Sequence, residues 1–125
     1  MCIRDSKTVI LTGDGGLNLN LGEVWTAVQE ALDLTVIVMN DRGYGVIRHI
    51  QDAQNAPRRY DRLAAPDLQG LAALADMPYR RVAAPAELGD AATEMIAHSG
   101  PALIEVDMIA IGEAPPYYPY GPKLG

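Results

Sequence analysis

The chain has 125 residues, 49% of them hydrophobic and 21% charged, a balance typical of one globular domain and not of a disordered segment. Its formal net charge of −6 argues against a nucleic-acid partner, because such partners are bound by neutralising phosphates. The longest apolar runs, Val9–Thr12 and Leu34–Met39, are far shorter than the roughly 20 residues of a membrane-spanning helix, and the single cysteine suits a cytoplasmic protein without internal disulfides.

Residues 1–6 do not fit the pattern that follows them. They carry charge without an apolar stretch, so they do not form a signal peptide, and an apolar run begins directly after them at Lys7. We expect residues 1–6 to be an artefactual leader on a truncated reading frame and residues 7–107 to form the domain. Residues 108–125 are rich in proline and tyrosine, which predicts an extended tail.

Two apolar runs in the first half of the chain predict buried strands. Lys7–Thr12 ends in a tight loop of three glycines and one aspartate, Gly13–Gly16, and Leu34–Met39 ends in a second polar loop at 40–45. Between them, Asn20 followed by Glu23 predicts a capping box at the start of a helix. The apolar face of that helix would consist of Leu21, Val24, Val28, Ala31 and Leu32.

The second half of the chain continues the alternation of helices and strands. In chain order we expect a helix at Val46–Gln51, a loop at 53–66, a helix from Pro66 to Ala75 capped by Asp67, a weak strand at Tyr79–Ala83, a helix from Pro85 to His98 and a strand at Ala102–Val106. This alternation predicts a doubly wound α/β domain, with a mostly parallel sheet and helices on both faces.

The two polar loops carry the residues suited to chemistry. Each follows a strand, and ligands of an open parallel sheet bind at the carboxyl ends of its strands. If the two strands are neighbours, Asp14 and Asp41 face the same crevice. Glycine loops and the start of a helix favour a phosphate group, but two carboxylates repel it unless a cation lies between them. Mg²⁺, which prefers oxygen ligands shared with phosphates, meets that requirement.

The segment from Gly13 to Gly45 resembles the diphosphate-binding motif of the thiamine-diphosphate-dependent enzymes. That motif begins with Gly-Asp-Gly and ends in Asn-Asn, or sometimes Asn-Asp, and here Asp14 and Asp41 are 27 positions apart. The stretch Asn20–Ala27, with the sequence NLGEVWTA, also resembles the helix inside the family's motif. The resemblance covers nearly everything after Ser6 and is nearest to the acetolactate synthase-like branch, which includes decarboxylases and carboligases of 2-oxo acids.

The resemblance implies that this chain binds thiamine diphosphate through Mg²⁺, as the C-terminal part of a transferase or lyase. Asp14 and Asp41 would bind the metal through their side chains, and Gly43 through its backbone carbonyl. Asn40 would brace the loop without touching the metal. The complete cofactor-binding set would be Gly13, Asp14, Gly15, Gly16, Asp41, Gly43, Tyr44 and Gly45. Asp41 stands where asparagine is commoner, and its extra charge should hold Mg²⁺ more tightly but attract the diphosphate slightly less.

The same resemblance implies which parts of the catalytic machinery lie outside this chain. The glutamate that activates the cofactor belongs to a pyrimidine-binding domain in a neighbouring subunit, and the apolar residue that bends the cofactor lies upstream of Gly13. We therefore assign no catalytic residue and expect the chain alone to be inactive. The parent enzyme would be a homodimer or homotetramer acting on a 2-oxo acid, and its C-terminal segment could fold over the active site.

Two other interpretations are compatible with the same residues. Gly13-Asp14-Gly15 follows a strand and Asp41 ends the next one, as in a dinucleotide-binding domain of an oxidoreductase. Asn18 stands where the third glycine of that motif belongs, and the motif does not explain Asn40 or the glycines after it. The second interpretation is a non-catalytic α/β interaction module, since Asp-Gly is also a common turn dipeptide.

Overall fold

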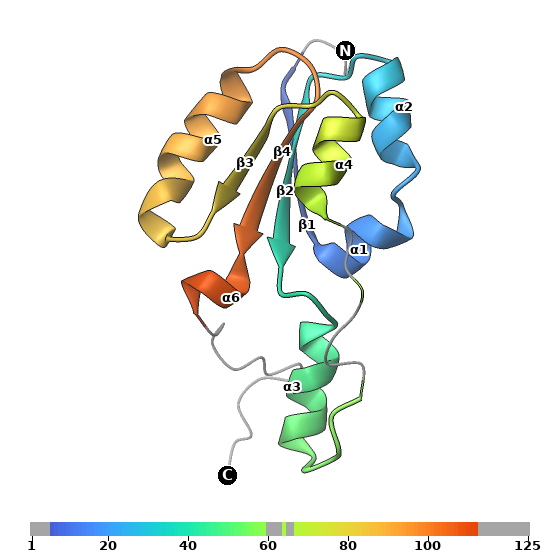
Figure 1. Ribbon diagram of the computed structural model, residues 1–125, viewed down its shortest axis with the longest axis vertical. Helices are drawn as coiled ribbons and strands as arrows, with labels where there is room; N and C mark the ends of the chain where they lie inside the picture. Colours follow the sequence, from blue (N-terminus) through green and yellow to red (C-terminus); the bar gives the residue numbers. More distant parts are fainter. Residues whose placement is uncertain (1–5, 60–63, 65–66, 113–125) are drawn as a thin grey trace.

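The computed structural model describes residues 6–59, 64 and 67–112, so the predicted leader apart from Ser6 and most of the predicted tail lie outside the described residues. Its centre is a four-stranded parallel sheet in the order β1-β2-β4-β3 (Figure 1). The strands are β1 (Thr8–Gly13), β2 (Leu34–Asn40), β3 (Tyr79–Val82) and β4 (Ala102–Asp107). The parallel sheet predicted from the alternation of strands and helices is confirmed.

Helices cover both faces of this sheet, as the sequence predicted. They are α1 (Asp14–Leu19), α2 (Glu23–Gln29), α3 (Gly45–Ala53), α4 (Leu68–Leu74), the 3₁₀ turn η2 (Pro85–Glu87), α5 (Leu88–Ala97) and α6 (Met108–Ile111). Buried residues of α1, α2 and α4 share one hydrophobic cluster, whereas those of α5, with α6 beside them, share another. Helix α3 extends beyond the carboxyl ends of the strands (Figure 1).

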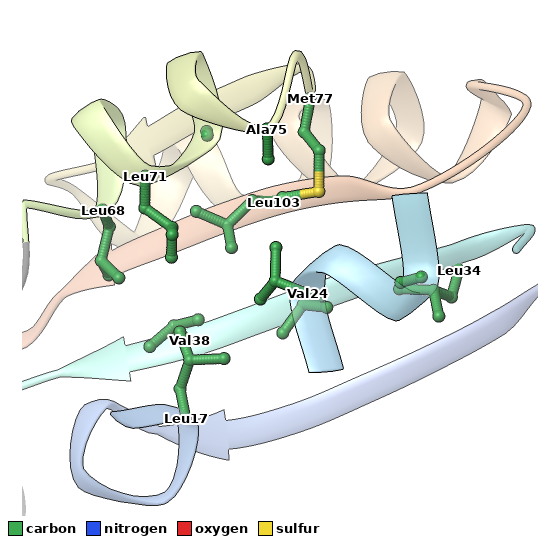
Figure 2. Packing of buried hydrophobic residues seen from close by; sticks show 12 residues of the cluster. Leu17, Val24, Leu34, Val38, Leu68, Leu71, Ala75, Met77 and Leu103 are labelled. Carbon is green, nitrogen blue, oxygen red and sulfur yellow. The ribbon is translucent and has the colours of Figure 1, made fainter. Parts of the chain in front are cut away.

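Strand β4 lies in the middle of the packed core. All six of its residues are buried, because both faces of the strand are covered by helices. On one face, Leu103 belongs to a hydrophobic cluster with Val38 of β2 and with leucines of α1 and α4, including Leu17 and Leu71 (Figure 2). On the other face, Ile104 packs with α5. This core fixes the positions of the strand ends, where the polar loops begin.

The prediction that the first strand is buried is wrong for the described part of the chain. Strand β1 is at the edge of the sheet, and Val9, Ile10 and Leu11 are 46%, 41% and 70% exposed. Both β1 and β2 have apolar sequences, but only β2 has a strand on each side. An apolar run gives the tendency of a segment to form a strand, whereas its place in the sheet depends on the pairing with other strands.

Three predicted boundaries also differ from the structure. The segment Gly13–Gly16 is not a loop, since Gly13 is the N-cap of α1 and Asp14 its first residue. Asn20 is not the N-cap of a helix but the C-cap residue of α1, and its side-chain amide donates to the carbonyl of Gly16 at 3.2 Å. Helix α2 starts later, at Glu23, without a side-chain cap. Helix α1 was therefore not predicted, and the predicted helix corresponds to α2 alone.

The start of the predicted tail is helical. Residues Met108–Ile111 form α6, because the carboxylate of Asp107 accepts hydrogen bonds from the backbone N–H groups of Ile109 and Ala110 and caps the helix. The prolines that led us to expect an extended segment begin only at Pro115, outside the described residues. The predicted cap at Asp67 is confirmed, since its side chain accepts from the N–H of Gln69 at 3.1 Å.

None of the helices in the described part of the chain is both long and apolar enough to span a membrane.

The central position of β4 leads to a stability prediction. Leu103→Ala should lower the free energy of unfolding by about 2–5 kcal/mol, because it removes a fully buried side chain and leaves a cavity. The matched control is Leu74→Ala on α4, whose side chain is 82% exposed and whose loss should change stability by less than about 0.5 kcal/mol. Urea denaturation measures both, and equal effects of the two substitutions would contradict the described packing.

Candidate functional site

The two segments predicted to carry the chemistry meet at the carboxyl ends of β1 and β2. These strands are neighbours with Gly13 in register with Met39, so Asp14 and Asp41 both follow directly beyond the sheet. A cleft of about 760 Å³ opens there. Its lining includes all eight residues of the predicted set, namely Gly13, Asp14, Gly15, Gly16, Asp41, Gly43, Tyr44 and Gly45. The structure thus brings them together, whereas their roles as ligands stay predictions.

The carboxylates of Asp14 and Asp41 converge on one backbone group. Asp14 is 8% exposed, and its Oδ2 accepts from the N–H of Gly43 at 3.1 Å. Asp41 Oδ1 accepts from the same N–H at 3.2 Å. The other oxygen of Asp14 accepts from the N–H of Gly15 at 2.9 Å. The amide of Gly43 therefore ties the start of α1 to the loop after β2 and holds two negative charges close together.

This closeness changes the acidity of Asp14. Burial raises the pKa of the Asp14 carboxyl above its ordinary value, and the negative charge of Asp41 raises it further. The hydrogen bonds from Gly15 and Gly43 oppose the rise but do not cancel it. Ionisation of Asp14 is thus less favourable here than in water, and a cation between the two carboxylates would relieve the repulsion.

A basic residue that the sequence did not single out also enters the site. Arg48, on the first turns of α3, places Nη2 2.7 Å from Asp41 Oδ2. Arg48 lies three positions after Gly45, a spacing that turns both residues of a helix toward the same side. That spacing was visible in the sequence, but it points to Asp41 only once the direction of α3 is known. His49, Asp52 and Arg58 line the same cleft, and none of them was in the predicted set.

Two glycines are required here by packing around the carboxylate and the tyrosine ring. A Cβ atom at Gly45 would lie 2.0 Å from Asp41 Oδ2, so the side chain of Asp41 would have to leave its present position. A Cβ atom at Gly15 would lie 3.0 Å from the ring of Tyr44. The glycines therefore make room for neighbouring side chains in the cleft, which is a different need from the close approach to a ligand expected from the sequence.

The oxygen atoms of the site fit a hard cation whose coordination would be completed by further groups, some of them from outside the chain. Two carboxylates and a backbone carbonyl are oxygen donors of the kind that Mg²⁺ prefers. Within the described ranges, no group of three or more histidine, cysteine, aspartate and glutamate side chains is placed to hold a metal ion. A metal ion at this position would need backbone carbonyls, water or phosphate oxygens to complete its coordination.

Comparison with known proteins points to one family. A family model described as thiamine pyrophosphate enzyme, C-terminal TPP binding domain, matches residues 1–106. The chain is 31% identical over 103 residues to the mitochondrial acetolactate synthase catalytic subunit of Aspergillus candidus. That match covers 82% of this chain and 15% of the subunit. It is 27% identical over 108 residues to a 2-succinyl-5-enolpyruvyl-6-hydroxy-3-cyclohexene-1-carboxylate synthase of Leuconostoc citreum. That match covers 84% of this chain and 20% of the synthase.

A solved structure is similar in fold. Benzoylformate decarboxylase from Polynucleobacter necessarius superposes with a TM-score of 0.71 over 82% of this chain and 19% of that chain, at 21% identity. At this identity the likeness supports the fold alone. The chain spans between 15% and 20% of the length of the two curated relatives named above.

The raised pKa of Asp14 leads to a titration experiment on the metal-free protein. Because the pKa lies above the ordinary value of 3.8, ionising Asp14 lowers stability, and this loss appears as the pH rises through the raised pKa. Nuclear magnetic resonance of the carboxyl carbons should show Asp14 titrating at a higher pH than Asp33. The reference Asp33 has its pKa lowered by a hydrogen bond from Lys7. The reverse order would contradict the rise in the pKa of Asp14 that burial and the charge of Asp41 produce.

Proposed function

This chain belongs to the thiamine pyrophosphate enzymes as a C-terminal TPP binding domain, and from this premise we propose that it binds the cofactor's diphosphate through Mg²⁺. We further propose that it does so within a 2-oxo acid decarboxylase or carboligase similar to acetolactate synthase. The observation that supports the metal is the convergence of Asp14 and Asp41 on the N–H of Gly43 at the carboxyl end of the sheet. Two carboxylates placed so close, beside a site for a diphosphate, call for a divalent cation.

The proposed roles follow the positions of the residues in the cleft. The side chains of Asp14 and Asp41 and the carbonyl of Gly43 would hold Mg²⁺. The diphosphate would contact Gly13, Gly15, Gly16, Tyr44 and Gly45, which line the same cleft. When bound, the cofactor supplies the carbanion-stabilising centre for a 2-oxo acid, while the protein orients it and sets the charge around it.

At Asp41 the chain departs from the family's motif, in which asparagine is commoner. Arg48 affects what the extra negative charge does to the site. The guanidinium of Arg48 pairs with one oxygen of Asp41. This pairing offsets the extra negative charge, so that the attraction of the site for a diphosphate is preserved. We propose that Asp41 and Arg48 act together as the equivalent of a neutral asparagine in the net charge of the site.

The larger enzyme belongs to the same proposal. Its partner would be a pyrimidine-binding domain of a neighbouring subunit, in a cytoplasmic homodimer or homotetramer that acts on a 2-oxo acid. The dinucleotide-binding alternative is disfavoured by the family assignment. Binding of that kind needs no metal, so the metal dependence of binding separates the two. The interaction module is the alternative in which the chain binds no cofactor.

Metal-dependent binding can be tested with one substitution. Asp14→Ala should weaken the binding of thiamine diphosphate by more than tenfold, that is, by more than about 1.4 kcal/mol, and excess Mg²⁺ should restore part of the loss. Asp90→Ala on α5 is a matched control, because Asp90 is exposed and lies outside the cleft. Calorimetric titration at several Mg²⁺ concentrations gives the affinities. Unchanged affinity in Asp14→Ala would refute the metal assignment, and metal-independent binding of NAD would favour the dinucleotide alternative.

The chain by itself should not catalyse the reaction. It offers groups for the phosphate end of the cofactor, whereas the glutamate expected to act on the aminopyrimidine end belongs to another domain. Incubation of the purified chain with pyruvate, Mg²⁺ and thiamine diphosphate should release no carbon dioxide above the background without protein. A complete acetolactate synthase serves as the positive control, and a comparable rate from the chain alone would show that all of the catalytic groups are present in it.

A further inference from the structure

A buried carboxylate lies beneath the loop that follows β2. Glu105 is 7% exposed in the middle of β4, between apolar residues. Burying an ionised carboxylate is costly unless it is hydrogen-bonded, and Glu105 has two donors on neighbouring strands. Oε1 accepts from Asn40 Nδ2 of β2 at 2.7 Å, and Oε2 accepts a short hydrogen bond from the hydroxyl of Tyr79 of β3. Glu105 therefore links three strands that are neighbours in the sheet, β2, β4 and β3 (Figure 1).

Glu105 fixes the direction in which the amide of Asn40 points. An ionised carboxylate only accepts hydrogen bonds, so the NH₂ end of the amide must face Glu105. The oxygen end then faces the loop, where it accepts from the N–H of Arg42 at 3.0 Å. Asn40 is 5% exposed and both ends of its amide are bonded, so it has no alternative orientation of comparable energy.

The hydrogen bond to Arg42 holds a strained backbone. Arg42 has φ +57, a left-handed conformation that residues with a Cβ adopt at a cost. The guanidinium of Arg42 is held as well, by Asp107 at 2.9 Å. The next residue is Gly43, whose N–H binds both Asp14 and Asp41. The conformation of Arg42 thus decides where the peptide of Gly43 lies between the two carboxylates.

From these contacts we propose that Glu105 is a positioning residue for the loop that binds the metal and diphosphate, acting through Asn40 and the N–H of Arg42. The proposal rests on the function proposed above. None of Glu105, Asn40 and Arg42 lines the cleft, so Glu105 acts on the cofactor only through the geometry of the loop. It keeps the peptide of Gly43 oriented before the ligand arrives, which spares the ligand the entropic cost of ordering the loop.

An exchange of hydrogen-bond partners tests this role. Asn40→Asp puts two carboxylates face to face and should lower the affinity for Mg²⁺ with thiamine diphosphate by about 10–100-fold, as for other partners of metal-binding groups. Adding Glu105→Gln to the same protein restores the hydrogen bond between positions 40 and 105 with its direction reversed. The amide at position 105 then donates to the carboxylate at position 40. The introduced carboxylate still accepts from the N–H of Arg42, and the introduced amide still accepts from Tyr79. The double variant should therefore bind within about fivefold of Glu105→Gln alone.

Two further measurements separate positioning from general stability. Tyr79→Phe removes one donor to Glu105 and should weaken cofactor binding several-fold without unfolding the chain. Thr35→Val is the matched control, since it removes a buried hydrogen bond from Thr35, at the start of β2, to the carbonyl of Met95 on α5, away from the loop. It should lower the urea midpoint but leave affinity unchanged. Amide hydrogen exchange at Arg42 should be faster in Asn40→Asp and slow again in the double variant.

The outcomes distinguish this proposal from the one on which it rests. If the unmodified chain does not bind thiamine diphosphate in the presence of Mg²⁺, the proposed function fails. If the unmodified chain binds but the double variant is folded and no better than Asn40→Asp, the positioning role of Glu105 is overturned. The same conclusion follows if Thr35→Val weakens binding as much as Tyr79→Phe does. Restored binding together with slow exchange at Arg42 supports the role.

Discussion

The site depends on the repulsion between two carboxylates that the fold holds against one backbone N–H. Asp14 begins α1 and Asp41 follows β2, and the pairing of β1 with β2 brings them together. Burial raises the pKa of Asp14, and the charge of Asp41 adds to that rise. A cation held between the two carboxylates, as proposed, would relieve this repulsion and so stabilise the domain.

That arrangement is possible because the sheet beneath it is rigid. Strand β4 is buried along its whole length and is packed from both sides, so the ends of β2 and β4 cannot shift relative to each other without opening the core. The polar residues at these ends are themselves part of the framework. Glu105 holds Asn40, and Asp107 holds Arg42 and Arg81 while capping α6. Hydrophobic packing places the strands, and buried charges then fix the loop.

The same logic accounts for the neighbours of the carboxylates. Asp41 carries a charge where the family more often has an amide, and the structure supplies Arg48 beside it. Gly45 makes room for the carboxylate, since any side chain there would overlap with Asp41. Substitution at one of these positions therefore changes the requirements at the others. For this reason the residues of the motif cannot be assessed one at a time.

The sequence by itself indicated most of the elements in their order, the parallel sheet, helices on both faces and eight of the residues that line the cleft. Periodicity and the spacing from Gly13 to Gly45 are local properties, and they survive in the sequence without any knowledge of packing. Only the tertiary structure decided that β1 is an edge strand, that Asn20 ends α1, and that Arg48 and Glu105 support the loop. Edge position, a helix break and a hydrogen bond between residues 65 positions apart depend on which segments pack together. That choice is made by the burial energy of the whole chain, which no local pattern contains.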